Sequence, residues 1–204
     1  MDSNIIVALD VDDNRAIKIA GDLKDEVFAF KVGYPLLMGS GVKIVRRISS
    51  FGRVIADLKI ADIPEVSANI AKELTSNGAH GVIVHGFAGR DVVRECRKSS
   101  RELYVVAEMS HPGSLDFISP HSEDIALMAK EEGADGIVAP ATRPERIRKL
   151  KDISGLKVLS PGVGAQGGSY LVAVENGADY VIIGRSITMS TDPREALAKI
   201  AGRK

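Results

Sequence analysis

Short runs of β-branched and other apolar residues recur along the chain at intervals too wide for β-hairpins. We interpret eight of these runs as strands, at residues 5–9, 27–32, 54–56, 81–84, 103–107, 136–138, 156–159 and 180–183. Near-continuous apolar runs are typical of parallel strands covered on both faces. Between them, apolar residues at three-to-four spacing, as in 36–48 and 70–74, predict amphipathic helices. The pattern therefore predicts a strand–helix unit repeated eight times.

A recurring Gly-Ala motif precedes three of these strands, at residues 78–80, 133–135 and 177–179, where it is followed by His or Asp. Glycine commonly ends a helix, so the motif marks helix-to-strand turns. No linker or break in composition interrupts the repeats. We therefore expect an α/β fold, a (β/α)8 TIM barrel forming a single catalytic domain over residues 1–204, rather than a doubly wound open sheet.

The charge and composition of the chain indicate which class of molecule it binds. Lys plus Arg and Asp plus Glu each number 27, and no basic run indicates a nucleic-acid or membrane surface. Residues 1–4 lack the positive charge of a signal peptide, and no apolar run approaches the ~20 residues that span a bilayer. We expect a cytoplasmic protein that binds a small molecule. The single cysteine, Cys96, allows no internal disulfide.

Polar residues of functional type follow the predicted strands, where TIM barrels carry their chemistry. Asp57 and Lys59 are two apart, so on a strand both would point into the barrel mouth while Leu58 faces the helices. An alternating set of charges would keep buried lysines ionised, or would form a purely structural ion-pair network. The set comprises Lys31, Asp57, Lys59 and Asp62, with Asp10, His85, Glu108 and Ser110 at other strand ends.

A glycine-rich segment follows the seventh predicted strand. Residues 161–168 contain G-x-G-x-x-G, but this dinucleotide fingerprint belongs in a first βαβ unit. Here the glycines would free backbone N–H groups to bind an anion, and a guanidinium follows the eighth strand. We predict a phosphate site, with a flexible turn as the alternative, formed by Pro161, Gly162, Val163, Gln166, Gly184 and Arg185.

The sequence does not predict a metal site. The four histidines lack metal-ligand spacing, and Cys96 has no metal-type partner. The acidic run 10–13 could bind a cation but would equally cap the helix that follows. No G-x-S-x-G surrounds Ser110, so its hydroxyl is better suited to reading the polar edge of a ligand. We expect neither metal nor cofactor.

Residues 57–64, Asp-Leu-Lys-Ile-Ala-Asp-Ile-Pro, resemble the D-x-K-x-x-D-I-P signature of archaeal-type orotidine 5′-monophosphate decarboxylases. The resemblance extends over essentially the whole chain, through residues 8–10, 30–35, 108–113, 160–168 and 183–186. It implies decarboxylation of orotidine 5′-monophosphate to uridine 5′-monophosphate and CO2, the last step of de novo pyrimidine biosynthesis. It also implies a homodimer with active sites at the interface.

The same resemblance implies roles for single residues. Lys59 protonates carbon 6 of the pyrimidine, Asp57 lies against the departing carboxylate, and Lys31 completes the charge network with Asp62 of the partner subunit. The substrate-binding roles fall to Asp10 for the ribose, Ser110 for the pyrimidine, Gln166 between base and phosphate, and Arg185 with the glycine backbone for the phosphate. One departure is Val66, where the family usually has a Thr that reaches a ribose hydroxyl in the neighbouring site.

Two alternatives stay open. A magnesium-dependent branch of the same suprafamily, which includes a gulonate-phosphate decarboxylase and a hexulose-phosphate synthase, shares D-x-K-x-x-D and acts on keto-sugar phosphates. Those enzymes use an acid in strand two, where this chain has Lys31, whose ammonium would repel a divalent cation. A non-catalytic nucleotide-binding barrel would keep the phosphate loop but would not need the lysine–aspartate array.

Overall fold

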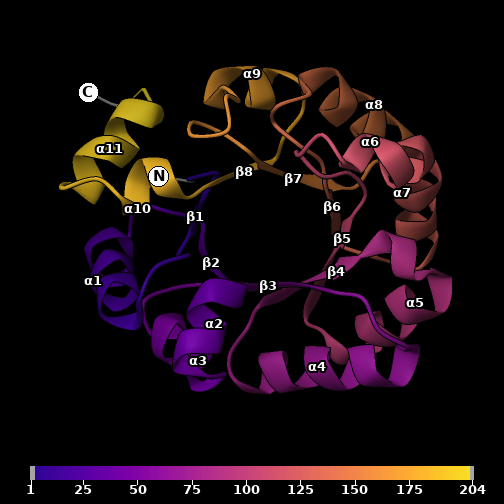
Figure 1. Cartoon of the computed structure of the whole chain (residues 1–204), viewed down its shortest axis with the longest axis horizontal. Coiled ribbons are helices and arrows are strands. Elements are labelled where there is room, and N and C mark those ends of the chain that lie inside the picture. Colours follow the sequence, from indigo (N-terminus) through magenta and orange to yellow (C-terminus); the bar gives the residue numbers. More distant parts are fainter. Residues whose placement is uncertain (1–2, 203–204) are drawn as a thin grey trace.

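The computed structural model describes residues 3–202 as a closed barrel of eight parallel strands, in which β8 pairs back with β1 (Figure 1). This confirms the predicted barrel and excludes the open sheet. The strands are β1 (Ile5–Ala8), β2 (Ala29–Gly33), β3 (Val54–Ile60), β4 (Gly81–His85), β5 (Glu102–Val106), β6 (Gly136–Val138), β7 (Lys157–Pro161) and β8 (Tyr180–Ile183).

A ring of helices surrounds the strands (Figure 1). They are α1 (Asp13–Leu23), α2 (Tyr34–Ser40), α3 (Lys43–Ser49), α4 (Pro64–Ser76), α5 (Arg90–Ser99), α6 (Ser114–Phe117), α7 (Ser122–Glu131), α8 (Pro144–Ser154), α9 (Tyr170–Glu175), α10 (Arg185–Thr188) and α11 (Pro193–Ile200), with 3-10 turns η1 (Gly86–Ala88) and η2 (Ser119–His121). Within residues 3–202, none of these helices combines the length and apolar character needed to cross a membrane.

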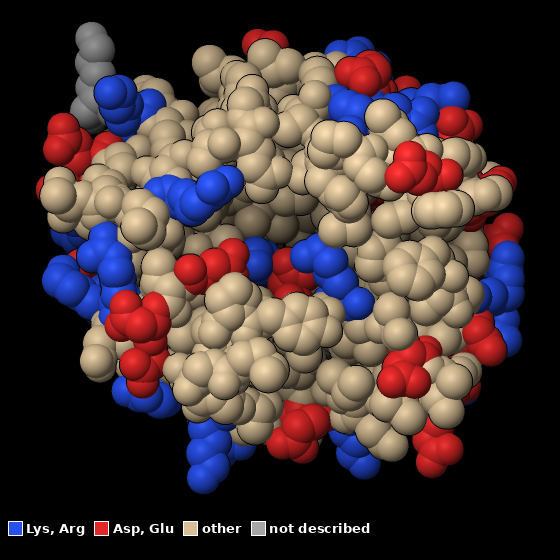
Figure 2. Space-filling view, in the orientation of Figure 1, with Lys and Arg blue, Asp and Glu red and all other residues tan. Residues whose placement is uncertain are grey.

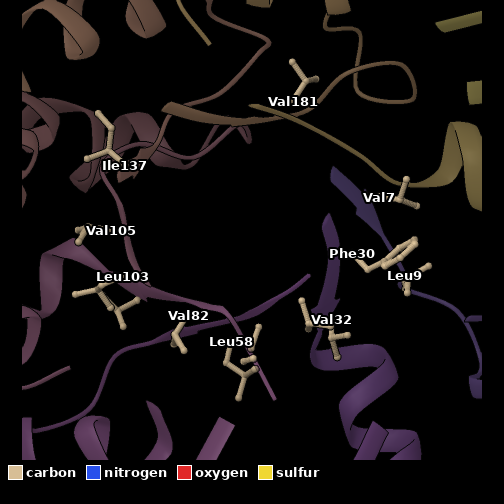
Figure 3. Close-up of a cluster of buried hydrophobic side chains, with 14 of the residues drawn as sticks. Val7, Leu9, Phe30, Val32, Leu58, Val82, Leu103, Val105, Ile137 and Val181 are labelled. Atoms are coloured by element: carbon tan, nitrogen blue, oxygen red, sulfur yellow. The ribbon is translucent and has the colours of Figure 1, made fainter. Parts of the chain in front are cut away.

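Apolar side chains pack in two layers, one inside the barrel and one outside it. The inner layer includes Ile6, Ile55, Tyr104 and Leu159, all fully or almost fully buried. The outer layer lies between the strands and the helices, and Figure 3 shows strand side chains such as Val32, Val82 and Ile137 in it. Strands buried on both faces explain why the runs in the sequence are continuously apolar rather than alternating.

The Gly-Ala motifs form the expected helix-to-strand turns, with Gly78, Gly133 and Gly177 at φ of 101°, 73° and 100°. In two of them the following aspartate also bonds the neighbouring strand. Asp135 accepts a hydrogen bond from the Leu103 backbone N–H at 2.8 Å, and Asp179 accepts one from the Val158 N–H at 2.7 Å. These carboxylates therefore hold the amino-terminal ends of β5 and β7 in place.

The amino-terminal mouth of the barrel is closed by a polar and aromatic cluster. Glu102 accepts hydrogen bonds from Arg53 at 2.6 Å and from the Tyr104 hydroxyl at 2.9 Å. Phe28 stacks on Tyr180 with ring centroids 3.9 Å apart. This end of a TIM barrel usually serves stability, so the functional site is expected at the opposite end.

Candidate active site

A cavity of about 430 Å³ opens at the carboxyl ends of the strands. Its floor is apolar, formed by Ala8, Val106, Val138 and Ile182. Figure 2 shows acidic and basic side chains meeting in the central hollow. Eleven of the twelve predicted site residues line it, all except Asp62: Asp10, Lys31, Asp57, Lys59, Ser110, Pro161, Gly162, Val163, Gln166, Gly184 and Arg185.

Two lysines and two aspartates form a continuous ion-pair array in this cavity. Lys31 Nζ lies 3.2 Å from Asp57 Oδ2 and 3.5 Å from Asp10 Oδ1, and Lys59 Nζ lies 3.0 Å from both Asp57 oxygens. Burial opposes the charge of Asp57, but the ammonium groups of Lys31 and Lys59 hold its pKa below the usual value. Burial likewise opposes the charge of Lys31, whose pKa the carboxylates of Asp57 and Asp10 raise. Lys31 and Asp57 therefore stay ionised at neutral pH.

Gly33, the last residue of β2, makes room for this array. A Cβ added there would lie 2.8 Å from Asp10 Oδ1 and 3.1 Å from Lys31 Nζ. Any side chain would thus push apart the ion pair that joins β1 and β2. The sequence-based interpretation did not single out this glycine, although it lies in one of the segments that carry the family resemblance.

Lys59 reaches the cavity from an irregular strand. Its φ is 43°, the sole positive value at a non-glycine residue within residues 3–202, and the β3–β4 register shifts between Asp57 and Ile60. The prediction that both side chains enter the mouth is confirmed. The alternation along β3 also holds, because Leu58 and Ile60 pack on the outer side of the barrel, even though the pairing with β4 shifts here. Leu58 packs toward the helices, as expected.

Asp62 does not join the array within one chain. It is exposed, and its carboxylate accepts a hydrogen bond from the N–H of Ile63 at 2.7 Å. The buried Ser67 holds its backbone, because the hydroxyl donates to the Asp62 carbonyl at 2.9 Å and accepts from the Asp62 N–H at 3.2 Å. Ser67 is therefore already engaged and does not replace the threonine hydroxyl missing at Val66.

The glycine-rich segment forms a turn that bonds to itself and to α10. The Gly164 N–H donates to the Gly168 carbonyl at 2.9 Å, and the Ala165 N–H donates to Ser186 Oγ at 3.2 Å. Gln166 reaches across the cavity, where its side-chain oxygen accepts a hydrogen bond from the Ser110 hydroxyl at 2.7 Å. Arg185, the first residue of α10, is exposed and forms no ion pair within residues 3–202.

His85 lies beside the array at the end of β4, 6% exposed. Its Nε2 is 3.3 Å from Met109 Sδ, and its Nδ1 is buried without a hydrogen-bond partner. Burial, together with the nearby charge of Lys59, lowers the pKa of His85 to about 4. The imidazole is therefore neutral at physiological pH. Within residues 3–202, the contact with the Met109 sulfur is the one side-chain hydrogen bond that the His85 ring forms.

The sequence-based interpretation named Glu108, which lines the cavity, but missed its two arginine partners. Glu108 is 1% exposed, and its carboxylate accepts hydrogen bonds from Arg143 at 2.9 Å and Arg146 at 2.8 Å. Both arginines come from the segment after β6, a strand end at which no polar residue was proposed. The signal that could have found them is a buried acid after β5 that requires cationic partners.

The acidic run that follows β1 divides between the array and a helix cap. Asp10 belongs to the array, while Asp12 caps α1 by accepting a hydrogen bond from the Arg15 N–H at 3.1 Å. Within residues 3–202, no three His, Cys, Asp or Glu residues are grouped as they would be around a metal ion.

Comparison with known proteins places this geometry in a family. The profile described as "Orotidine 5'-phosphate decarboxylase / HUMPS family" matches residues 3–200. Orotidine 5'-phosphate decarboxylase of Methanococcoides burtonii is 50% identical over 205 residues, which cover 97% of this chain and 95% of that protein. The corresponding protein of Pyrococcus abyssi is 46% identical, covering 96% of both chains.

Solved structures agree with this assignment. The orotidine 5'-monophosphate decarboxylase of Methanocaldococcus jannaschii, complexed with the inhibitor BMP, superposes with a TM-score of 0.92 at 43% identity and covers 98% of this chain and 97% of that chain. The enzyme of Pyrococcus horikoshii gives a TM-score of 0.90 at 47% identity, covering 96% of each chain. With the whole barrel matched in sequence and structure, the chain belongs to the orotidine 5′-phosphate decarboxylase / HUMPS family.

Proposed function

We propose that this protein decarboxylates orotidine 5′-monophosphate to uridine 5′-monophosphate and CO2, completing pyrimidine nucleotide synthesis. The observation that carries the proposal is the Lys31–Asp57–Lys59 array, buried in a cavity that also contains a glycine-rich anion loop. Loss of CO2 leaves an electron pair on carbon 6 with no adjacent carbonyl to delocalise it. The site must therefore stabilise a localised negative charge, which a fixed ammonium group can do.

Lys59 is the proposed proton donor. Its ammonium attracts the electron pair left on carbon 6, then transfers a proton to that carbon, and solvent reprotonates the neutral amine. Asp57, 3.0 Å away, holds the ammonium in place without solvent reorganisation and lies against the departing carboxylate. Lys31 balances the charge of Asp57 at 3.2 Å, so the array keeps both aspartate and lysine ionised.

The remaining site residues hold the nucleotide. Asp10 binds the ribose, while Ser110 and Gln166, which already share a hydrogen bond, read the pyrimidine edge and connect it to the phosphate. The exposed guanidinium of Arg185 binds the phosphate with backbone N–H groups of Gly162, Val163 and Gly184, while Pro161, which has no N–H, only lines the site. Binding the remote phosphate provides energy for ordering the site, so phosphate-free orotidine should react poorly.

The family description also covers the HUMPS branch, which makes keto-sugar phosphates the main alternative substrates. Lys31 argues against that branch. Its ammonium lies 3.5 Å from Asp10 and 3.2 Å from Asp57, so it occupies the space between carboxylates that a divalent cation would need. We therefore propose that the reaction proceeds through Lys59 without metal or cofactor.

The test follows the loss of orotidine 5′-monophosphate absorbance in excess EDTA. We expect rapid decarboxylation by the wild type and by Lys24→Ala, which alters an exposed lysine at the end of α1, but none by Lys59→Ala. An inert wild type would refute the assignment, and activity on keto-sugar phosphates restored by magnesium would support the alternative.

We further propose that the active protein is a homodimer in which Asp62 completes the partner's array. Apolar side chains are exposed on the surface around Asp62, including Ile63 at 63% and Met38 at 78%. A groove beside them is lined mainly by apolar residues of α2 and α4, among them Leu37, Val66 and Ile70. Exposed apolar side chains of this kind are typical of an interface, and Ile63 directly follows Asp62, whose carboxylate does not line the cavity of its own chain.

Subunit mixing tests this arrangement. Lys59→Ala and Asp62→Ala should each be nearly inactive alone, but after subunit exchange each mixed dimer has one site with both wild-type residues. Random exchange should restore about a quarter of the wild-type activity. If mixing restores nothing although sedimentation shows exchanged dimers, Asp62 does not act across the interface.

A further inference from the structure

The segment that carries Ser110 leaves the sheet before it reaches the cavity. β5 ends at Val106, and the N–H groups of Ala107 and Glu108 both donate to the Val138 carbonyl at 3.1 Å. Met109 and Ser110 therefore have no strand to fix their backbone, although Ser110 must meet Gln166 at 2.7 Å. Something other than the sheet has to set the position of the Ser110 hydroxyl.

Two side-chain arms hold the Met109 peptide from opposite sides. On one side, Arg143 donates a hydrogen bond to the Met109 carbonyl. On the other side, the Met109 N–H donates to Ser114 Oγ at 3.3 Å, which lies 3.1 Å from Ser119 Oγ. Both arms end on one oxygen, because Glu108 Oε1 accepts from Arg143 at 2.9 Å and from Ser119 at 3.1 Å.

We propose that this ring, the Glu108 clamp formed by Glu108, Arg143, Ser114 and Ser119, positions Ser110 and Gln166 to read the base of the substrate. Glu108 and Arg143 are positioning residues: they act through the Met109 peptide. The inference rests on the proposed function, since it assigns the clamp to the base-recognising side of that nucleotide site.

The burial of the clamp supports a precise geometry. Glu108 is 1% exposed and the Arg143 side chain 21%, so their ion pair is shielded from water and stronger than a surface pair. Arginine suits this position because its planar fork satisfies a carboxylate and a carbonyl at the same time. A lysine at 143 would keep the charge beside Glu108 but would give up the fixed geometry toward Met109.

Arg146 provides a matched control. It binds the other oxygen of the same carboxylate at 2.8 Å, but its remaining contacts are with Ser122 and Glu123, away from Met109. Arg146→Lys therefore removes a comparable guanidinium contact to Glu108 but leaves the bond from Arg143 to Met109 in place, and it reaches the other arm only indirectly, through Ser122 and the Ser119 carbonyl. The proposal distinguishes these two arginines, whereas a purely stabilising role for the cluster would not.

The test measures calorimetric affinity for uridine 5′-monophosphate and for ribose 5-phosphate, which has the same sugar phosphate but no base. In Arg143→Lys we expect affinity for the nucleotide to fall about tenfold while that for ribose 5-phosphate stays within about twofold. In Arg146→Lys the ratio of the two affinities should stay at the wild-type value. Circular dichroism confirms that each variant is folded.

A double-variant cycle completes the test. If Arg143 acts through Ser110, the nucleotide affinity lost in Arg143→Lys/Ser110→Ala should be no greater than that lost in Ser110→Ala alone. Additive losses, equal losses for both ligands, or an equal effect of Arg146→Lys would overturn the clamp. Wild-type turnover of orotidine 5′-monophosphate is measured separately, so a failure of the proposed function is not confused with a failure of the clamp.

Discussion

The buried imidazole of His85 should contribute measurably to the destabilisation of this barrel in acid. The side chain is 6% exposed, its Nδ1 has no partner, and its Nε2 faces only the sulfur of Met109. Burial and the ammonium of Lys59 oppose a positive charge on this ring, and together they outweigh the carboxylate of Asp57, which favours it. His85→Phe removes the titrating group and retains a neutral ring that can pack against Phe87, whose centroid lies 4.1 Å from the imidazole.

The magnitude follows from proton linkage. The pKa of His85 falls from an ordinary 6.5 to about 4 on folding, so below pH 6.5 the unfolded chain binds a proton that the folded chain rejects. Stability is therefore present above pH 6.5 and is lost as the pH falls toward 4. The resulting loss in the free energy of unfolding is near zero at pH 7, about 2 kcal/mol at pH 5 and about 3 kcal/mol at pH 4.

Urea unfolding at pH 7, 6 and 5, at constant ionic strength, measures this effect. The free energy of unfolding of the wild type should fall by about 2 kcal/mol more than that of His85→Phe between pH 7 and pH 5. Other titrating groups cancel in the difference between the two proteins. Parallel pH profiles would refute the reasoning, because they would show that His85 titrates alike in the folded and unfolded states.

Three further substitutions test the packing of the site and of the barrel. Gly33→Ala places a Cβ 2.8 Å from Asp10 Oδ1, so we expect kcat/KM for orotidine 5′-monophosphate to fall about 10- to 100-fold; unchanged kinetics would contradict this. Gly164→Ala puts a side chain at φ of 77° and against Ser186, so KM should rise more than kcat falls, and a fall confined to kcat would count against a role in binding. Tyr104→Phe should lower the free energy of unfolding by about 1 kcal/mol and leave kcat intact, whereas altered kinetics would show that the closed end of the barrel affects the site.

The barrel was predictable because each strand is buried on both faces, which leaves a continuous apolar run in the sequence. The ends of the helices were harder to predict from the sequence. The single helix expected over 36–48 is two, α2 and α3, because Gly41 adopts φ of 72° between them. A glycine in the sequence does not by itself show that a helix ends, and the apolar spacing continues on both sides of Gly41 as it would in one unbroken helix.

Site residues at strand ends were predictable from residue type and position, and eleven of the twelve line the cavity. What could not be predicted is how they are held. The left-handed backbone of Lys59 lies where the register between β3 and β4 shifts, and the bond from Arg143 to Glu108 in the clamp joins segments more than thirty residues apart. Neither leaves a local pattern, because both arise from contacts that exist only once the barrel has closed.

The left-handed backbone at Lys59 places strain at the residue that is the proposed proton donor. A non-glycine residue in this region is strained by about 1 to 2 kcal/mol, and glycine would relieve that strain. On backbone conformation alone, glycine would be more stable than lysine at position 59, but it would remove the proposed proton donor and its ion pair with Asp57. Lys59→Gly and Lys59→Ala both lose that ion pair, so Lys59→Gly should have the higher free energy of unfolding, and equal values would show that the strain lies elsewhere. The barrel thus keeps, at the centre of its mouth, a backbone conformation that the stability of the backbone alone would not select.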